Sequence, residues 1–196
     1  MNKTLFSILP LAILTACAGN SQSTNEEFLP NDTIYVDTLA ANHPEYLPEL
    51  PLDTIAPDIA APDTLGQTVR LSDFAGSYVV LDFWATWCGD CRREVPDLQQ
   101  LYADIHDKEL NGAPIQFLSY SFDRDAVQWK AFLQKEQFAW PQISTLEPKW
   151  HENAASQAYR LHWLPAFILV SPDGKVAGKA ITAKGIRQIL KQESEK

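Results

Sequence analysis

Long apolar runs, basic residues and cysteines are all scarce in this sequence of 196 residues. No apolar run reaches the roughly 18 to 20 residues that a membrane-spanning helix needs. Lys and Arg number 16 against 25 Asp and Glu, a net charge of -9, so we expect no nucleic-acid partner. The three cysteines are too few for a disulfide scaffold. The length instead suits one domain with an appendage.

The N-terminus has the features of a bacterial signal sequence. Lys3 precedes an apolar stretch over residues 5–14, which has the length of a signal-peptide core. The Leu-Thr-Ala-Cys sequence that ends at Cys17 resembles a lipobox, the cleavage signal of bacterial lipoproteins. This resemblance implies removal of residues 1–16 and lipid on Cys17, which would anchor the mature chain to a lipid bilayer. The alternative is an ordinary signal peptide that is cut elsewhere.

Acidic residues and prolines are concentrated ahead of the main domain. Residues 17–63 contain nine Asp or Glu, six of the 13 prolines and no Lys or Arg, whereas residues 64–196 have a net charge of -1. Like charges and frequent proline disfavour a compact core. We therefore expect residues 17–54 to form a solvated tether, with a short strand at residues 33–39. An acidic docking site for a partner is the alternative.

Residues 55–196 are expected to form one α/β domain, because apolar runs alternate with segments of helical periodicity. Strands are expected at residues 66–71, 78–84, 115–121, 166–171 and 176–181. Helices are expected around residues 95–105, 129–136, 149–160 and 186–190, the second of them capped by Asp123 or Asp125. Strand, helix, strand, helix, hairpin and helix in this order predict helices packed around one central sheet.

Cys88 and Cys91 directly follow the strand expected at residues 78–84 and begin the next helix. A sulfur at a helix N-terminus faces unpaired backbone N–H groups and the positive end of the helix dipole, which stabilise its thiolate. A cysteine three residues later lies one turn along the same face, within reach for a disulfide. We therefore expect Cys88 to attack a disulfide and Cys91 to release the mixed intermediate.

Other uses of this cysteine pair fit less well. Zinc would need four ligands, but the sequence has no second cysteine pair and no histidines at a matching spacing. Covalent haem needs a histidine directly after the second cysteine, where this chain has Arg92. We therefore expect no metal and no cofactor beyond a redox-active Cys88–Cys91 disulfide. A purely structural disulfide stays open, because the cell envelope is oxidising.

Residues 79–91, VVLDFWATWCGDC, and the RREVP that ends at Pro96 resemble the thioredoxin superfamily. The lead-in APDTLGQTVRLSDFAG and the segment LPAFILVSPDGKV make the chain similar to the membrane-tethered thiol–disulfide oxidoreductases of the TlpA/ResA type. The resemblance covers residues 55–191. It implies a thioredoxin-like fold, with a central mixed β-sheet flanked by helices, an N-terminal extension and a helical insertion at residues 125–138. It also implies a periplasm-facing envelope location and reduction of protein disulfides.

Individual residues carry over from this resemblance. Cys88 matches the nucleophile, Cys91 the resolving thiol, and Pro96 the proline that kinks the first active-site helix. Leu164 and Pro165 match the cis-proline segment, whose backbone pairs with the extended substrate in the family.

Two carboxylic acids are candidates for proton transfer. Asp82 matches the buried aspartate beneath the second cysteine of thioredoxins, and burial should raise its pKa so that it suits a general base for Cys91. Glu94 matches a glutamate near the dithiol in the tethered branch, with a solvated helix residue as the alternative. Trp84 and Trp87 are expected to shield the thiols, and Trp87 also to contact substrate. Plain packing is the alternative for both tryptophans.

Asp90 stands where many relatives have a proline before the second cysteine. Its carboxylate should oppose thiolate formation, which makes the redox couple less oxidising. We therefore expect a reductant rather than a strong oxidase with a potential of about -120 mV. Such a reductant would need a membrane electron donor, as the family implies. Disulfide oxidase or isomerase activity is the alternative.

Two other functions remain as weaker alternatives. A peroxidase of the neighbouring peroxiredoxin group would have a threonine and a proline where this chain has Ala85 and Leu81. Copper carriers of the superfamily place three residues between their cysteines and add a histidine. The spacing of two between Cys88 and Cys91 argues against a non-catalytic copper-handling module.

Overall fold

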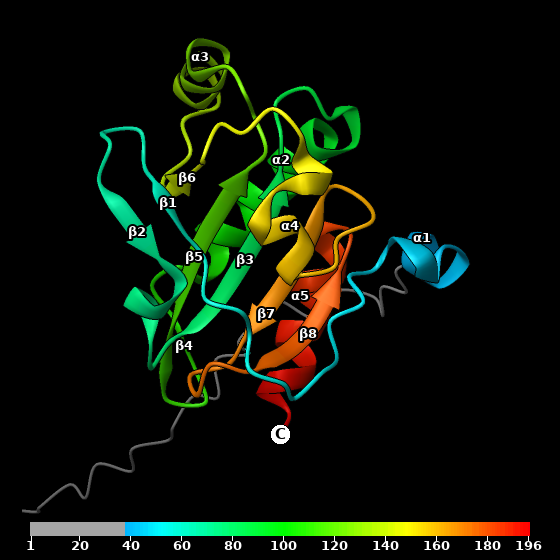
Figure 1. Cartoon of the computed structure of the whole chain (residues 1–196). Coiled ribbons are helices and arrows are strands. Elements are labelled where there is room, and N and C mark those ends of the chain that lie inside the picture. The colour runs from blue at the N-terminus through cyan, green and yellow to red at the C-terminus, as the bar shows by residue number, and fades with distance from the viewer. Residues whose placement is uncertain (1–37) are drawn as a thin grey trace, which may run out of the picture.

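The computed structural model describes residues 38–196. The predicted signal sequence, Cys17 and most of the predicted tether lie outside this part of the chain. A mixed sheet forms the centre, with strand order β4-β5-β3-β7-β8 and β6 paired to β5 (Figure 1). Its strands are β3 (Tyr78–Trp84), β4 (Glu109–Leu110), β5 (Ala113–Ser121), β6 (Gln142–Ile143), β7 (Ala166–Val170) and β8 (Val176–Ala180). β3 is parallel to β5 and antiparallel to β7, so the prediction of a mixed central sheet is confirmed.

Helices cover both faces of this sheet (Figure 1). Their bounds are α2 (Gly89–Ile105), α3 (Ala126–Glu136), α4 (Ala154–Ala158) and α5 (Ala183–Ser194). The later turns of α2 and the side chains of α5 pack in one hydrophobic cluster with the sheet. Side chains of α3 and α4 belong to the other cluster, together with Cys91 at the start of α2. All seven residues of β3 are buried because both of its faces are covered, which explains its nearly continuous apolar sequence.

Alternation along β3 decides which side chains reach which layer. Val79, Leu81 and Phe83 belong to the cluster with α3 and α4, whereas Val80 packs with α2 and α5. Successive strand residues point to opposite faces. Asp82 therefore lies on the α2 side of the sheet, where it lines a small cavity together with Cys91 and Glu94.

A small antiparallel hairpin precedes the sheet. β1 (Ala60–Pro62) pairs with β2 (Thr68–Arg70), within the expected strand at residues 66–71, and Asp63 bridges to Ile143 of β6. The insertion predicted at residues 125–138 is α3, whose N-terminus is capped by Asp125. The Asp125 side chain accepts hydrogen bonds from two backbone N–H groups, so this alternative of the predicted cap is confirmed.

Two predicted elements are wrong in part. The helix expected at residues 149–160 is divided into a 3₁₀ turn, Trp150–Glu152, and α4. Asn153 separates them because its backbone is extended and its side chain caps α4 through the Ala155 N–H. The strand expected at residues 33–39 is also not found where the structure describes it, since α1 (Thr38–Asn42) is already helical at its first residue.

The end of the predicted tether is packed against the domain. Leu50 is buried, the Glu49 N–H donates to the Arg160 carbonyl at 3.3 Å, and the Asp53 N–H donates to the Val176 carbonyl at 2.9 Å. The predicted boundary between tether and domain, at residues 54 and 55, therefore lies within a segment that is already packed on the domain. The segment packs there because the apolar residues between its acidic residues contact the domain. No helix within residues 38–196 has the length and apolar character to cross a membrane.

Candidate active site

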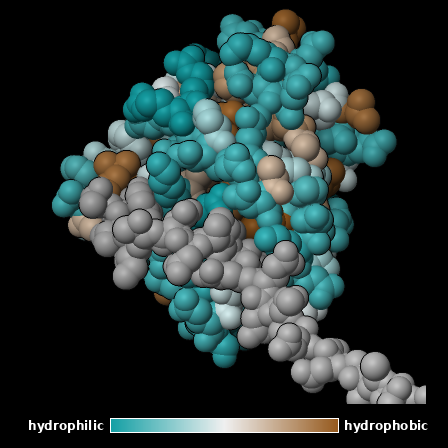
Figure 2. Space-filling view, turned by 180° about the vertical axis from the view of Figure 1, so that it is seen from behind, coloured by the Kyte–Doolittle hydropathy of each residue, from teal (hydrophilic) through white to brown (hydrophobic). Residues whose placement is uncertain are grey.

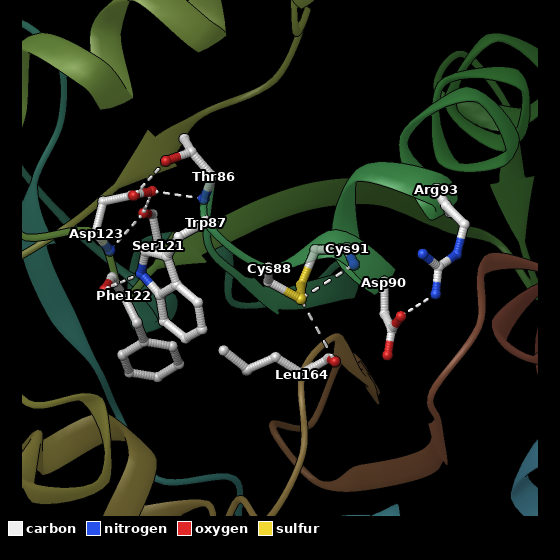
Figure 3. The surroundings of a disulfide bond; sticks show 10 residues. All are labelled: Thr86, Trp87, Cys88, Asp90, Cys91, Arg93, Ser121, Phe122, Asp123 and Leu164. Atoms are coloured by element: carbon white, nitrogen blue, oxygen red, sulfur yellow. Dashed lines mark hydrogen bonds and ion pairs between the residues drawn. A yellow bond between two sulfur atoms is a disulfide. The ribbon is translucent and has the colours of Figure 1, made fainter.

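The two predicted redox cysteines lie at the start of α2, immediately after β3. They form a disulfide with a Cα–Cα distance of 5.3 Å. Cys88 is the N-cap of the helix, and its Sγ accepts a hydrogen bond from the Cys91 N–H at 3.1 Å (Figure 3). A donor aimed at this sulfur, together with the positive end of the helix dipole, favours the thiolate of Cys88 once the disulfide is reduced.

The two cysteines differ in solvent exposure. Cys88 is 8% exposed and Cys91 is 3% exposed, and Trp87, directly before the pair, is 49% exposed. Cys88 Sγ also lies 3.6 Å from the carbonyl oxygen of Leu164 (Figure 3). Cys88 is thus the more exposed of the two cysteines, and Cys91 is the more deeply buried.

The Leu164–Pro165 peptide bond is cis, as the resemblance implied. Both residues are buried, and Pro165 directly precedes β7, the strand that pairs with β3. The carbonyl of Leu164 therefore faces the cysteine pair from the opposite side of the site. This arrangement presents backbone hydrogen-bonding groups next to a reactive sulfur.

Asp82 lies beneath the disulfide and is 4% exposed. Burial is the main cause that raises the pKa of Asp82 to about 7. The hydrogen bond from Ser119 lowers this pKa, and the negative charge of Glu94 raises it. The Ser119 hydroxyl donates to Asp82 Oδ2 at 3.0 Å and accepts from the Trp140 indole at 2.8 Å. The carboxyl group is therefore held in one orientation.

A cavity of about 10 Å³ is lined by both Asp82 and Cys91. This volume is near the smallest that holds one water molecule. A general base can act through one intervening water. The geometry thus allows Asp82 to take the proton of Cys91.

Glu94 lines the same cavity and is half-buried. Its Oε2 accepts a hydrogen bond from the Ala183 N–H at 2.7 Å. Ala183 is the first residue of α5, so the carboxylate satisfies one of the free N–H groups there. Glu94 thus joins α2 to α5 and also places a negative charge near Asp82.

Changing Glu94 to Ala is expected to lower the free energy of unfolding by about 1 kcal/mol, because a helix N-terminus loses its acceptor. It should also lower the pKa of Asp82, because a neighbouring negative charge is removed. Glu94→Gln keeps an acceptor oxygen and removes only the charge. Urea unfolding and the pH dependence of the thiol reaction measure the two effects separately, and equal behaviour of the two variants in both assays would contradict this dual role.

The structure places a positive charge next to the Asp90 carboxylate. Asp90 forms an ion pair with Arg93, one turn later on α2 (Figure 3). The guanidinium offsets part of the repulsion that the carboxylate would exert on a thiolate. Since the Arg93 side chain is 74% exposed, solvent weakens this pairing. The argument for a less stable thiolate therefore holds in weakened form.

Sequence analysis missed the role of Asp123, which it considered only as a helix cap. Asp123 is 3% exposed and accepts hydrogen bonds from the Thr86 N–H at 2.9 Å, the Thr86 hydroxyl at 2.5 Å and the Ser121 hydroxyl at 2.6 Å. The Trp87 indole donates to the Phe122 carbonyl at 3.3 Å (Figure 3). The end of β5 thus holds the loop before Cys88. The sequence did contain a signal for this contact. If the strands that became β3 and β5 are parallel, both end at the same edge of the sheet, so the residues that follow them lie close together.

Across residues 38–196, no three His, Cys, Asp or Glu side chains gather in a way that could hold a metal ion. Among the tryptophans expected to shield the thiols, Trp84 lines the small cavity beside Cys91, and Trp87 lies exposed at the surface.

Residues 52–179 match the sequence profile of the AhpC/TSA family. The chain belongs to the AhpC/TSA family. Curated relatives include the thiol-disulfide oxidoreductase ResA of Geobacillus thermodenitrificans, 29% identical over 71% of this chain and 74% of that protein. A ResA of Bacillus cereus is 25% identical over 92% of this chain and 88% of its own length.

Solved structures point to the same branch of the AhpC/TSA family. The thioredoxin domain of a thiol-disulfide oxidoreductase from Bacteroides vulgatus is 30% identical, with a TM-score of 0.63 over 75% of this chain and 97% of that domain. A thiol:disulfide interchange protein from a Bacteroides species is 28% identical, with a TM-score of 0.64 over 75% of this chain and 92% of that protein. This AhpC/TSA member is therefore a thiol–disulfide oxidoreductase with a thioredoxin-like fold, as predicted.

Proposed function

We propose that this protein reduces disulfide bonds of other proteins in the cell envelope, with Cys88 as the nucleophile and Cys91 as the resolving thiol. The observation that carries this proposal is the position of Cys88. Its sulfur caps α2, faces the Leu164 carbonyl before the cis-proline, and is more accessible than Cys91. An extended client segment can pair with this backbone while its disulfide meets the Cys88 sulfur.

The reaction proceeds in two exchanges that start from the dithiol. The Cys88 thiolate attacks one sulfur of the client disulfide, a mixed disulfide forms, and the other client sulfur leaves as a thiolate. Cys91 then gives its proton to Asp82 through the small cavity and attacks Cys88 Sγ. The Cys88–Cys91 disulfide forms and the second client thiol is released. Two electrons pass to the client, and a membrane electron donor restores the dithiol.

Reduction of insulin by the dithiothreitol-reduced protein and its equilibrium potential against glutathione together test the direction. We expect insulin reduction and a potential closer to the value of about -270 mV of thioredoxin than to the value of about -120 mV of a strong oxidase. A potential near the oxidase value would overturn the reductive direction in favour of oxidase or isomerase activity. Stoichiometric Cu(I) binding without insulin reduction would favour a copper-handling module.

The location follows from the lipobox-like sequence that ends at Cys17. Lipid on this cysteine after removal of residues 1–16 would hold the domain at the membrane by a tether. Changing Cys17 to Ser is expected to move the protein from the membrane to the soluble fraction of the producing cells. Fractionation with immunoblotting measures the shift, and mass spectrometry of the wild-type N-terminus serves as the control. An unmodified Cys17 in the wild-type protein would contradict the anchor.

A further inference from the structure

A groove of about 280 Å³ lies beside the dithiol. This volume is just below the range of about 300 to 1,000 Å³ for pockets that hold a drug-sized ligand. Its apolar lining consists of Leu39, Tyr46, Trp163, Pro165 and Ile181. Leu39 and Tyr46 lie before residues 52–179, the stretch that matches the AhpC/TSA family. One wall of the groove is thus formed by the N-terminal segment that precedes this stretch.

That wall is a stack of three aromatic rings. The rings of His43 and Tyr46 have centroids 4.8 Å apart, those of Tyr46 and Trp163 are 4.2 Å apart, and each pair is within 9° of parallel. Trp163 directly precedes the cis Leu164–Pro165 bond. The N-terminal segment therefore packs on the loop that faces Cys88.

Hydrogen bonds hold this segment in place. The Lys179 ammonium donates to the Pro48 carbonyl at 2.8 Å, and the Glu49 N–H donates to the Arg160 carbonyl at 3.3 Å. Pro48 is buried, and Leu50 packs in the core cluster that also contains Leu164. The chain that carries the stacked wall is therefore fixed to the domain directly after Tyr46.

The charged members of the lining already have partners within the protein: Asp90 with Arg93, His43 with Glu45, and Glu94 with the Ala183 N–H. Their charges are therefore not free to select a charged ligand. On the rear face, the hydrophobic residues visible in Figure 2 mostly stand singly among hydrophilic ones. The groove, by contrast, brings aromatic and aliphatic side chains together, and the charged side chains around them have partners within the protein.

We propose that this groove binds an apolar or aromatic side chain of the client polypeptide, close to the cysteine that joins Cys88. The proposal rests on the proposed function, because its occupant is the client in the mixed disulfide. The groove is continuous with the reactive site. Pro165 lines both the groove and the small cavity beside Cys91, and the preceding Leu164 carbonyl lies 3.6 Å from Cys88 Sγ. A client chain laid along this backbone places a neighbouring side chain against Tyr46 and Trp163.

Peptide disulfides test the selectivity on the full-length reduced protein in detergent. Each peptide has one cysteine flanked by Phe, Leu, Ser or Asp, and it is disulfide-linked to a chromophoric thiol. We expect the Phe and Leu peptides to react about tenfold faster than the Ser peptide, a gain of about 1.4 kcal/mol that partial burial of one apolar side chain supplies. The Asp peptide should be no faster than the Ser peptide. Hydroxyethyl disulfide serves as a probe without flanking side chains.

Variants of Tyr46 assign the preference to the wall. Tyr46→Ala should reduce the preference to about twofold or less, because most of the apolar contact is lost. The rate with hydroxyethyl disulfide should stay at the wild-type value. Tyr46→Phe retains the ring and should keep the preference, and so should Leu65→Ala, a control at a side chain that is 81% exposed in the β1–β2 turn.

The outcomes separate this inference from the function on which it rests. Reduction of hydroxyethyl disulfide without any peptide preference would overturn the groove alone. Loss of hydroxyethyl disulfide reduction in Tyr46→Ala would also overturn it, because Tyr46 would then support the site as a whole. Failure of the wild-type protein to reduce any disulfide would overturn the proposed function itself.

Discussion

The Cys88→Ala variant is expected to lose insulin reduction down to the uncatalysed background, and the Cys91→Ala variant is expected to remain covalently joined to its clients. The difference follows from position, because Cys88 is the more exposed cysteine and lies beside the Leu164 carbonyl, whereas Cys91 is more deeply buried. Without Cys91 the mixed disulfide on Cys88 has no neighbouring thiol to release it. Non-reducing gel electrophoresis of membranes that contain each variant measures the trapped species.

The double variant Cys88→Ala/Cys91→Ala is the matched control, since it keeps the fold and removes both thiols. Trapped species should be absent from it and should disappear from Cys91→Ala upon addition of dithiothreitol. Trapping in Cys88→Ala instead of Cys91→Ala would reverse the two assigned roles. If neither single variant forms mixed disulfides, the exchange mechanism is wrong.

The Asp82→Asn variant is expected to resolve the mixed disulfide about 100-fold more slowly at pH 8, because a general base contributes at least this factor. In the wild-type protein the rate of this step should rise with pH through about 7, the pKa of Asp82. The variant should lose that rise, since the asparagine amide does not titrate in this pH range and cannot accept the proton. Rapid-quench measurement of the release of a thiol from the preformed mixed disulfide gives the rate at each pH.

The same substitution should stabilise the protein at pH 8. Burial raises the pKa of Asp82 from 3.8 to about 7, so its charged form costs stability. This cost is absent below pH 4 and grows as the pH rises through 7, to at most about 4 kcal/mol for a shift of this size. Urea unfolding of wild type and variant should therefore diverge between pH 4 and 8.

Ser119→Ala is the control that keeps the carboxyl group. It removes the hydroxyl that donates to Asp82 Oδ2, so the pKa of Asp82 should rise further and the rate profile should move to higher pH. An unchanged profile in both variants would show that Asp82 is only a buried structural acid.

Local sequence was sufficient to predict the elements whose residues strongly favour one secondary structure and one degree of burial. β3 is nearly all apolar because both of its faces are covered, and it has the expected bounds. α2 begins at the cysteine pair, where Cys88 can cap it, and ends at Ile105, as expected. The segment at residues 149–160 has no such dominant pattern. There the side chain of Asn153, which caps α4 and also contacts Tyr120 and Glu147, interrupts the helix.

In the candidate site, too, some residues could be predicted from local sequence and others could not. Cys88 and Cys91 were identified from their spacing and their place after a strand, and the cis bond before Pro165 was implied by resemblance. Asp123 and Glu94 could not be assigned so readily, because their partners are far away in sequence. Asp123 binds Thr86, and Glu94 binds the backbone of Ala183.

Residues close together in the chain are enough to identify the redox pair, the strand and helix that present it, and the acidic character of the N-terminal segment. The structure was needed to show that Arg93 pairs with Asp90, that Glu94 caps α5, and that Tyr46 stacks on Trp163 near the cysteine pair. The last two join residues about 90 to 120 positions apart along the chain, and the ion pair depends on side-chain conformation. The two long-range contacts follow from how the layers pack, whereas the ion pair is local to α2.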